Sequence, residues 1–263
     1  MQSDRPIVLS IAGFDPSGGA GVLADIKTLE QLNVQGMAVL TANTIQTENQ
    51  FIRMEWLPLD FMLESIQSLL LNYTVRVVKI GIVRDFHFLR SIVECVAKLN
   101  KEAFIVWDPV LESTSGFTFF SAMDIQLLIE LSDKIDLITP NYSEYLTLRT
   151  AFRIDDFKNV LIKGGHRKKK VGTDILKQGN MEFIFPPTTA VLFDKHGSGC
   201  VLSSAISAYL AWGKSIQDAC RLGKQYVEQF LNSNPGLLGY HHEIQQNTIY
   251  FSRENLGRTR EEH

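Results

Sequence analysis

The chain has 263 residues, of which 45% are hydrophobic and 21% are charged, a composition typical of a globular protein with one sizeable core. Its formal net charge of -3 argues against a nucleic-acid partner, because binding a phosphate backbone needs a surplus of basic residues. No segment reaches the roughly 18 apolar residues that a membrane helix needs, so we expect no membrane partner. The three cysteines are widely spaced and form no Cys-x-x-Cys motif, which indicates neither a disulfide framework nor a zinc site. We therefore expect a cytoplasmic protein.

Short apolar runs alternate with segments of helical spacing along the chain. The run IVLSIAG at residues 7–13 predicts a buried strand that ends in a glycine, and the segment 19–33 has the apolar spacing of a helix. Further strands are predicted, in chain order, at residues 36–46, 75–83, 103–110, 135–141 and 159–165, with a hairpin at 171–187. Further helices are predicted at residues 59–72, 85–101, 121–134 and 215–232, with a long one in 195–213.

This alternation predicts the fold class: an α/β protein whose mostly parallel sheet is covered by helices on both faces. No repeat or low-complexity linker interrupts the pattern, so residues 1–245 are predicted to form a single domain. The chain becomes polar after Tyr240, and we expect the tail at residues 246–263 to be frayed.

Glycine-rich or polar segments follow nearly every predicted strand. In an open parallel sheet, ligands bind beyond the carboxyl ends of the strands, so these segments are expected to meet in one site. The segment SGGAG at residues 17–21 lacks the dinucleotide-binding spacing, and it is equally well explained as a tight turn before a helix. No Walker-type phosphate loop is present in the sequence.

The segment HGSGC at residues 196–200 runs directly into an apolar helix. Gly197, Ser198 and Gly199 leave the backbone N–H groups open to close approach, which favours an anion such as a transferring phosphate at the helix start. The alternative is a glycine-rich helix cap with Ser198 as the capping residue. Cys200 lies in the first turn, where the helix dipole is expected to lower the pKa of its thiol. A buried, inert cysteine is the alternative for this residue, and it is the interpretation that we adopt for Cys95 and Cys220.

Carboxylates also occur at the predicted strand ends. Asp108 ends one strand, and Glu144 comes three residues after Asn141 in TPNYSE. Such hard oxygen ligands suit a Mg²⁺ ion that is shared with the phosphates of a nucleotide. The alternatives are a cap of the following turn for Asp108 and a charge in a first helical turn for Glu144. Asp25 lies on a helix that otherwise buries its face, so it needs a partner.

The charge run HRKKK at residues 166–170 has two interpretations. Such a run usually forms a solvated hairpin tip, and the alternative is a flap that touches nucleotide phosphates.

Taken in order, these motifs resemble the hydroxymethylpyrimidine and phosphomethylpyrimidine kinases of thiamine biosynthesis, a branch of the ribokinase-like superfamily. The resemblance covers most of the chain. It rests on IAGFDPSGGAGVLADIKT, TANTIQ, KIGIV, WDPV, ITPNYSE, KGGH and HGSGC, each modest alone and specific as an ordered set.

The resemblance implies a three-layer α/β/α sandwich with about eight strands. It also implies a kinase that uses ATP and Mg²⁺ to phosphorylate hydroxymethylpyrimidine and then its monophosphate. The γ-phosphate would sit at the GSGC backbone, and Cys200 would be the base where many relatives in the superfamily have an aspartate. A homodimer is also implied. The pyrimidine would be contacted by Gly13, Asp25 and Gln46, with Ile82 and Val110 as apolar walls. Asp108 and Glu144 match positions that serve Mg²⁺, and Asn141, Lys163, Gly165 and His166 match the nucleotide side.

The sequence departs from the family pattern in several places. Phe14 stands where serine is typical, Thr47 where asparagine is usual, and Ser198 where threonine is more common. The bulk of Phe14 indicates an altered substrate preference, including poor activity on the phosphorylated intermediate. The alternative functions are a pyridoxine or pyridoxal kinase on the same scaffold and a non-catalytic protein that binds a pyrimidine.

Overall fold

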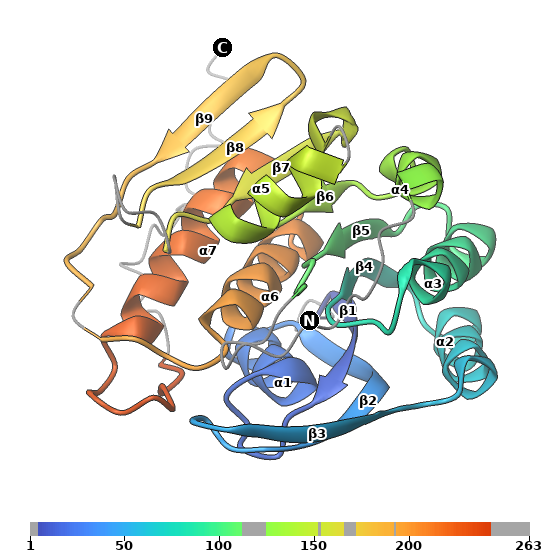
Figure 1. Cartoon of the computed structure of the whole chain (residues 1–263), viewed down its shortest axis with the longest axis horizontal. Coiled ribbons are helices and arrows are strands. Elements are labelled where there is room, and N and C mark those ends of the chain that lie inside the picture. The colour runs from blue at the N-terminus through green and yellow to red at the C-terminus, as the bar shows by residue number, and fades with distance from the viewer. Residues whose placement is uncertain (1–4, 112–124, 152–153, 166–171, 192, 243–263) are drawn as a thin grey trace, which may run out of the picture.

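The computed structural model describes residues 5–111, 125–151, 154–165, 172–191 and 193–242. Within them, nine strands form one sheet in the order β3-β2-β1-β4-β5-β6-β7-β8-β9 (Figure 1). The strands are β1 (Ile7–Phe14), β2 (Gln35–Gln46), β3 (Phe51–Trp56), β4 (Val75–Ile80), β5 (Phe104–Trp107), β6 (Leu137–Ile138), β7 (Asn159–Ile162), β8 (Asp174–Gln178) and β9 (Met181–Phe185). The helices are α1 (Gly21–Gln31), α2 (Leu59–Asn72), α3 (Phe86–Leu99), α4 (Ile125–Ser132), α5 (Tyr142–Ala151), α6 (Ser198–Ala211) and α7 (Ile216–Leu231), with a short 3₁₀ turn at Ile154–Asp156.

Six strands that are neighbours in the sheet pair in parallel, in the order β2, β1, β4, β5, β6 and β7. This confirms the predicted mostly parallel sheet. The antiparallel strand β3 lies at one edge, and the antiparallel pair β8 and β9 lies at the other. The predicted hairpin at residues 171–187 is therefore confirmed, and the part of the chain that the structure describes has nine strands where the resemblance implied about eight.

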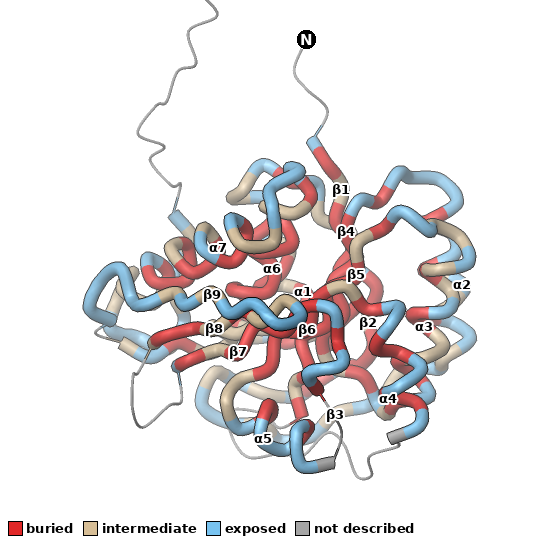
Figure 2. The backbone as a smooth tube through the Cα atoms, turned by 90° about the horizontal axis from the view of Figure 1, so that it is seen from above, coloured by how far each residue is buried: buried red, intermediate tan, exposed pale blue. Residues whose placement is uncertain are grey.

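Alternate residues of the central strands enter two separate apolar cores. Leu9 and Val78 pack on the side of helices α2 to α5, whereas their neighbours Val8 and Val77 pack on the side of α1, α6 and α7. Because both faces of the sheet are covered, the central strands read as continuous apolar runs. The buried strands lie between two layers of helices, in which exposed residues face outward and buried residues face the sheet, whereas α6 is buried along most of its length (Figure 2). These are the three layers that the resemblance implies.

Two elements were not among the predicted ones. Strand β3 is half exposed and has few consecutive apolar residues, so it gives little signal of a buried strand. Helix α5 has a mixed surface sequence, YSEYLTLRTA, with weak apolar periodicity. Strand β3 lies at the edge of the sheet, where burial constrains the sequence least, whereas α5 covers a sheet face but buries few apolar residues, among them Tyr145 and Leu148.

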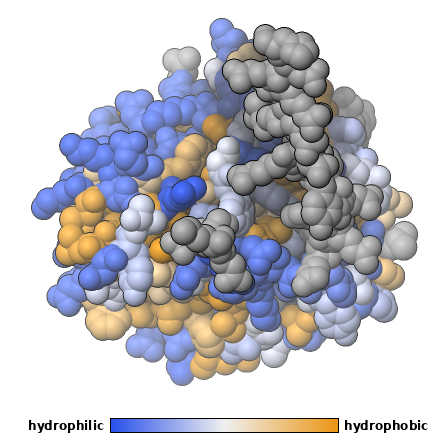
Figure 3. Space-filling view, turned by 180° about the vertical axis from the view of Figure 1, so that it is seen from behind, coloured by the Kyte–Doolittle hydropathy of each residue, from blue (hydrophilic) through white to orange (hydrophobic). Residues whose placement is uncertain are grey.

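Among the described residues, no helix is long and apolar enough to cross a membrane. On the face that Figure 3 shows, hydrophilic and hydrophobic side chains are interspersed. The predicted polar tail at residues 246–263 and the charge run at 166–170 lie outside the described residues.

Candidate active site

The loop after β1 is organised by the buried carboxylate of Asp15. This carboxylate accepts hydrogen bonds from the backbone and hydroxyl groups of Ser17, both at 2.9 Å, and from the backbone N–H of Ala20 at 2.9 Å. His196 Nε2 lies 2.8 Å from Asp15 Oδ2 and joins this loop to the segment before α6. Burial alone would raise the pKa of Asp15, but these hydrogen bonds hold it below its ordinary value. The loop is therefore fixed in its shape by an ionised side chain.

The glycines of the two loops allow close backbone contact. Gly197 has φ +74°, and a Cβ atom there would lie 1.9 Å from the carbonyl oxygen of Gly19. Gly21 has φ +57°, and its Cβ would lie 2.2 Å from the carbonyl oxygen of Gly13. No other residue fits either position, so both loops are pressed together at the carboxyl end of β1.

Helix α6 begins at Ser198, and Gly197 is its N-cap. The alternative that Ser198 is the capping residue is therefore wrong, because the cap is a left-handed glycine and no side-chain capping bond is present. The first turn of α6 holds no acidic residue, and its backbone N–H groups have no partners from an earlier turn of the same helix. Lys163 Nζ lies 3.3 Å from where a Cβ of Gly199 would be, which puts a cation beside this helix start. The arrangement is suited to hold an anion.

Lys163 is held in place by Asp108, which follows β5. Its ammonium lies 2.7 Å from Asp108 Oδ1. Asp108 is fully buried and also accepts hydrogen bonds at 3.0 Å from the hydroxyl groups of Thr139 and Ser203. Burial alone would lower the pKa of Lys163, but Asp108 and Glu144 raise it, so the lysine is positively charged.

Glu144 and Asn141 bond to each other across the first turn of α5. The Glu144 carboxylate accepts from the Asn141 backbone N–H at 2.7 Å, and the Asn141 amide oxygen accepts from the Glu144 backbone N–H at 2.9 Å. This reciprocal pair is a capping box, and it confirms the first-turn position that the sequence indicated for Glu144. Burial raises the pKa of Glu144 to about 7, with a further contribution from Asp108 and an opposing one from Lys163.

Asp108 and Glu144 are hard oxygen donors, but Asp108 is 0% exposed and its oxygens are already engaged by Lys163, Thr139 and Ser203. Direct ligation of Mg²⁺ by Asp108 is therefore not met in this arrangement, and the two carboxylates would act on a hydrated ion through its waters. Among the described residues, no three His, Cys, Asp or Glu side chains are grouped as a metal site. Waters and phosphate oxygens would therefore have to supply its ligands, as is usual for Mg²⁺ bound with a nucleotide.

Asp25 does have the partner that its position requires, and the partner is Lys79 of β4. The two are a buried ion pair with Nζ at 2.7 and 2.9 Å from the carboxylate oxygens. Ser10 and Ser204 donate to the same carboxylate at 2.6 and 2.7 Å. Because Asp25 is 0% exposed and its oxygens are all engaged, the expected direct contact between Asp25 and a pyrimidine is not met in this arrangement.

Cys200 is half-buried in the first turn of α6. Burial raises the pKa of its thiol to about 11, and the opposing influences of Lys79 and of a backbone hydrogen bond from Gly21 do not offset this. The expected lowering of this pKa by the helix dipole is therefore wrong, since desolvation of the thiolate is the larger effect. Cys95 is half-buried and Cys220 buried, and burial raises the pKa of each.

The remaining predicted residues lie near the carboxyl ends of the strands, except His166, which lies outside the described residues. Gly13 and Ile82 are adjacent, because a Cβ on Gly13 would come within 2.5 Å of the Ile82 side chain. Gln46 is the half-buried last residue of β2, and Val110 is half-buried two residues after Asp108. Gly165 is exposed, with no atom of the described residues within 4 Å of where its Cβ would be.

Several residues of this region were not singled out from the sequence. They are Lys79, Ser203 and Ser204, together with the loop residues Asp15 and His196. Lys79 gave a signal that could have been used: it is the lysine inside the otherwise apolar run VVKIGIV, where a buried cation needs an anion. The serines of α6 gave none, because small polar residues are common in helices.

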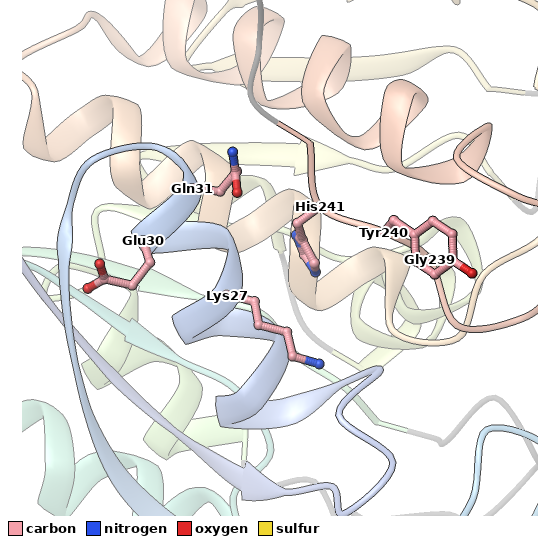
Figure 4. Close-up of a pocket in the computed structure, with 6 residues that line it drawn as sticks. All are labelled: Lys27, Glu30, Gln31, Gly239, Tyr240 and His241. Atoms are coloured by element: carbon pink, nitrogen blue, oxygen red, sulfur yellow. The ribbon is translucent and has the colours of Figure 1, made fainter.

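A separate pocket of about 500 Å³ lies on the outer side of α1. It is lined by Lys27, Glu30 and Gln31 of α1 and by residues 239–241, and the close-up shows the Glu30 carboxylate pointing away from that segment (Figure 4). Lys27 Nζ donates to the carbonyl oxygen of Gly18 at 2.8 Å and so joins the pocket to the loop after β1. None of the candidate catalytic residues lines this pocket, so we place the site at the strand ends instead.

The glycine-rich helix start and the lysine at the strand ends of this mostly parallel sheet form an anion site suited to phosphoryl transfer. A sequence model of the family described as phosphomethylpyrimidine kinase matches residues 15–245. The chain belongs to this family.

Relatives and solved structures agree with this placement. The chain is 34% identical over 253 residues to the hydroxymethylpyrimidine/phosphomethylpyrimidine kinase of Aquifex aeolicus, which covers 90% of this chain and 98% of the relative. The crystal structure of phosphomethylpyrimidine kinase from Clostridium difficile 630 matches with 33% identity and a TM-score of 0.71, over 86% of this chain and 99% of that one. The pyridoxal kinase from Staphylococcus aureus in complex with AMP-PCP and pyridoxal matches with 26% identity and a TM-score of 0.73, over 88% and 89%.

Proposed function

We propose that this protein phosphorylates 4-amino-5-hydroxymethyl-2-methylpyrimidine with ATP and then its monophosphate to the diphosphate. The observation that carries the proposal is the start of α6, where Gly197 to Cys200 lie between the loop after β1 and the Lys163–Asp108 pair. Family membership supports the choice of substrate.

The residues at the start of α6 stabilise the phosphoryl group in transfer. The backbone N–H groups of Ser198, Gly199 and Cys200 point out of the first turn and donate to the oxygens of the phosphoryl group. The ammonium of Lys163 neutralises the negative charge of that group. Lys163 donates to Asp108 Oδ1, and the hydroxyl of Thr139 donates to the same oxygen. The ammonium of Lys163 is therefore held in place and need not move during the reaction. Bound ATP supplies the phosphoryl group, and bound Mg²⁺ shields the phosphate charges.

Cys200 is the proposed base for the hydroxyl of the substrate. Cys200 acts in the small thiolate fraction that a pKa of about 11 leaves at neutral pH. As the hydroxyl oxygen forms its bond to the γ-phosphorus and the bond to the ADP oxygen breaks, the hydroxyl proton passes to that thiolate sulfur. Because the transition state of phosphoryl transfer is loose, positioning of the groups contributes more than the strength of the base.

The pyrimidine is proposed to bind beside β1, β2 and β4. Gln46 at the end of β2 would bond the polar edge of the ring, since an amide offers both a donor and an acceptor. Ile82 and Gly13 would provide a flat apolar wall, with Val110 on the other side. Asn141, Gly165 and His166 stay predictions for the nucleotide side, and Asp108 and Glu144 for Mg²⁺.

Pyridoxal kinase activity is the second candidate, favoured by the likeness to the Staphylococcus aureus enzyme with bound pyridoxal. Half-buried Phe14 lies at the end of β1, and its carbonyl oxygen accepts from the hydroxyl of Thr44 at 2.8 Å. A bulky side chain at this loop would crowd a phosphorylated pyrimidine more than the free alcohol, so the second phosphorylation is expected to be the slower.

The test is a product assay with the purified chain, ATP and Mg²⁺. Hydroxymethylpyrimidine and pyridoxal are supplied in parallel, and mono- and diphosphate products are resolved by chromatography. Formation of hydroxymethylpyrimidine monophosphate and then diphosphate supports the proposal. A strong preference for pyridoxal would favour the second candidate, and tight pyrimidine binding without ATP turnover would favour a binding protein.

We further propose a cytoplasmic homodimer. The family resemblance supports the dimer, and the three free cysteines support a reducing compartment. Size-exclusion chromatography with light scattering, at protein concentrations below and above the one used in the activity assay, tests the oligomeric state. A monomer mass throughout would contradict it.

A further inference from the structure

The ion pair between Asp25 and Lys79 is a charged group inside the protein that the reaction proposed above does not use. Both side chains are at most 1% exposed. A buried ion pair rarely adds stability over an apolar pair of the same size, because desolvating two charges offsets their attraction. Its presence next to a candidate active site therefore calls for a functional explanation.

The pair lies one helical turn from Cys200. Ser204, which donates to Asp25 Oδ1 at 2.7 Å, is four residues after Cys200 on α6, so the two side chains share one face of the helix. Lys79 Nζ lies 2.9 Å from the same Oδ1 atom. Gly21 of α1, whose backbone hydrogen bond reaches Cys200, begins the helix that carries Asp25. The ammonium is thus anchored on the thiol side of α6.

The charges facing Cys200 come from four elements. Lys79 of β4 favours the thiolate, whereas Asp25 of α1 and Asp108 after β5 oppose it. Lys163 after β7 also interacts with Cys200. Each lysine is held by its own aspartate, so both cations stay in the neighbourhood of Cys200 and would stabilise a negative charge on its sulfur.

We propose that Lys79 is a positioning residue of the phosphoryl transfer: its ammonium, fixed by Asp25, is the counter-charge that favours the thiolate of Cys200. This inference rests on the proposed role of Cys200 as the base. The proton of the substrate hydroxyl ends on the Cys200 sulfur, and Lys79 itself keeps all its protons and does not contact the substrate.

The test compares two single substitutions whose effects on Cys200 have opposite signs. Lys79→Met leaves the Asp25 charge beside the sulfur, so the rate of Cys200 alkylation by iodoacetamide at neutral pH is expected to fall about tenfold. Asp25→Asn removes the anion and leaves the cation, so the rate is expected to rise about tenfold. Peptide mass spectrometry reads Cys200 and the half-buried Cys95 separately, and Cys95 serves as an internal reference in each variant.

Two further variants separate the electrostatic effect from a loss of folding. Lys224→Met removes a buried lysine of α7 from its partner Asp174, and the two side chains are 6% and 8% exposed, respectively. In folded protein this variant is expected to leave the rate of Cys200 alkylation unchanged. The double variant Asp25→Asn with Lys79→Met has no buried charge left unpaired, so it is expected to fold if Lys79→Met does not. Its Cys200 rate is expected to lie between those of the two single variants.

Turnover measurements complete the test. Lys79→Met is expected to lower kcat and move the pH profile of kcat/KM to higher pH, with KM for ATP unchanged. Equal alkylation rates in both single variants, or a change in the same direction, would overturn the proposal because a merely structural pair has no sign. If the alkylation rates change as expected but the wild-type protein has no kinase activity, the proposed function fails and the electrostatic coupling stands.

Discussion

The protein buries lysine–carboxylate pairs in two regions, and the difference between them is instructive. The central cluster contains Asp25, Lys79, Asp108 and Lys163 around Cys200. The α7 cluster, defined here as Asp174, Lys224 and Glu228, joins α7 to β8 and to its neighbouring loops.

In the α7 cluster, each charged group is bonded to backbone or to another member. Lys224 Nζ is 3.3 Å from Asp174 Oδ2 and 3.3 Å from Glu228 Oε1, and it donates to the carbonyl oxygen of Gly172. Asp174 accepts from the backbone N–H of Gly164 at 2.7 Å, and Glu228 accepts from that of Thr188 at 3.0 Å. This cluster fixes loops, including the one beside Lys163.

The central cluster differs because a reactive atom and a helix start lie within it. Cys200 is half-buried, while its charged neighbours Asp25, Lys79 and Asp108 are at most 1% exposed. Burial of charge by itself therefore indicates only an ion pair. What lies beside the pair distinguishes a structural cluster from a functional one.

The largest expected effect is loss of turnover in Cys200→Ala. Removing the base is expected to lower kcat about 100-fold or more, while ADP binding measured by calorimetry stays unchanged because the N–H groups of α6 remain. The matched control is Cys220→Ala, a buried cysteine of α7, which is expected to keep its turnover. Wild-type turnover in Cys200→Ala would remove Cys200 from the mechanism.

The α7 cluster is broken most directly by Lys224→Met. Because two buried carboxylates lose their cation, the free energy of unfolding is expected to fall by about 3–5 kcal/mol in urea titrations. Turnover per folded molecule is expected to change less than in Lys79→Met. A variant as stable as the wild type would show that the α7 cluster is not structural.

The pH dependence of stability is expected to reveal Glu144. Its pKa is raised to about 7 by burial and by Asp108, above the ordinary value of 4.5, so its contribution to stability is fully present below about pH 4.5. It is lost as the pH rises through about 7, and the loss reaches about 3 kcal/mol. Urea titrations at pH 5 and pH 7.5 should show this decrease in the wild type and not in Glu144→Gln. Parallel behaviour of the two proteins would contradict the raised pKa.

The contact between the two glycine loops is tested by Gly197→Ala. The added Cβ would overlap the Gly19 carbonyl oxygen, so both stability and turnover are expected to fall, the former by about 2 kcal/mol through strain and displacement. Gly213→Ala is the matched control, because Gly213 has φ +78° with nothing within 4 Å of its Cβ position. It is expected to cost about 1 kcal/mol and to keep its turnover. Equal losses in both variants would show that strain alone matters.

Much of the fold could be predicted from the sequence, because strands buried on both faces and amphipathic helices leave strong patterns. The helix predicted at residues 59–72 coincides with α2, and the predicted strand at 7–13 differs from β1 by one residue. Strand β3 was missed because a half-exposed edge strand is under little pressure to be apolar. The glycine loops were also predicted, since left-handed and closely packed positions accept only glycine.

The sequence by itself determined the order of the elements, the location of polar loops at the carboxyl ends of the strands and the need of Asp25 for a partner. Only the tertiary structure decided that the partner is Lys79, 54 positions away, and that Asp25 has no free oxygen for a ligand. It also decided that burial raises rather than lowers the pKa of the Cys200 thiol. The physical reason is that local patterns depend on neighbours along the chain, whereas desolvation and charge pairing depend on residues that folding brings together.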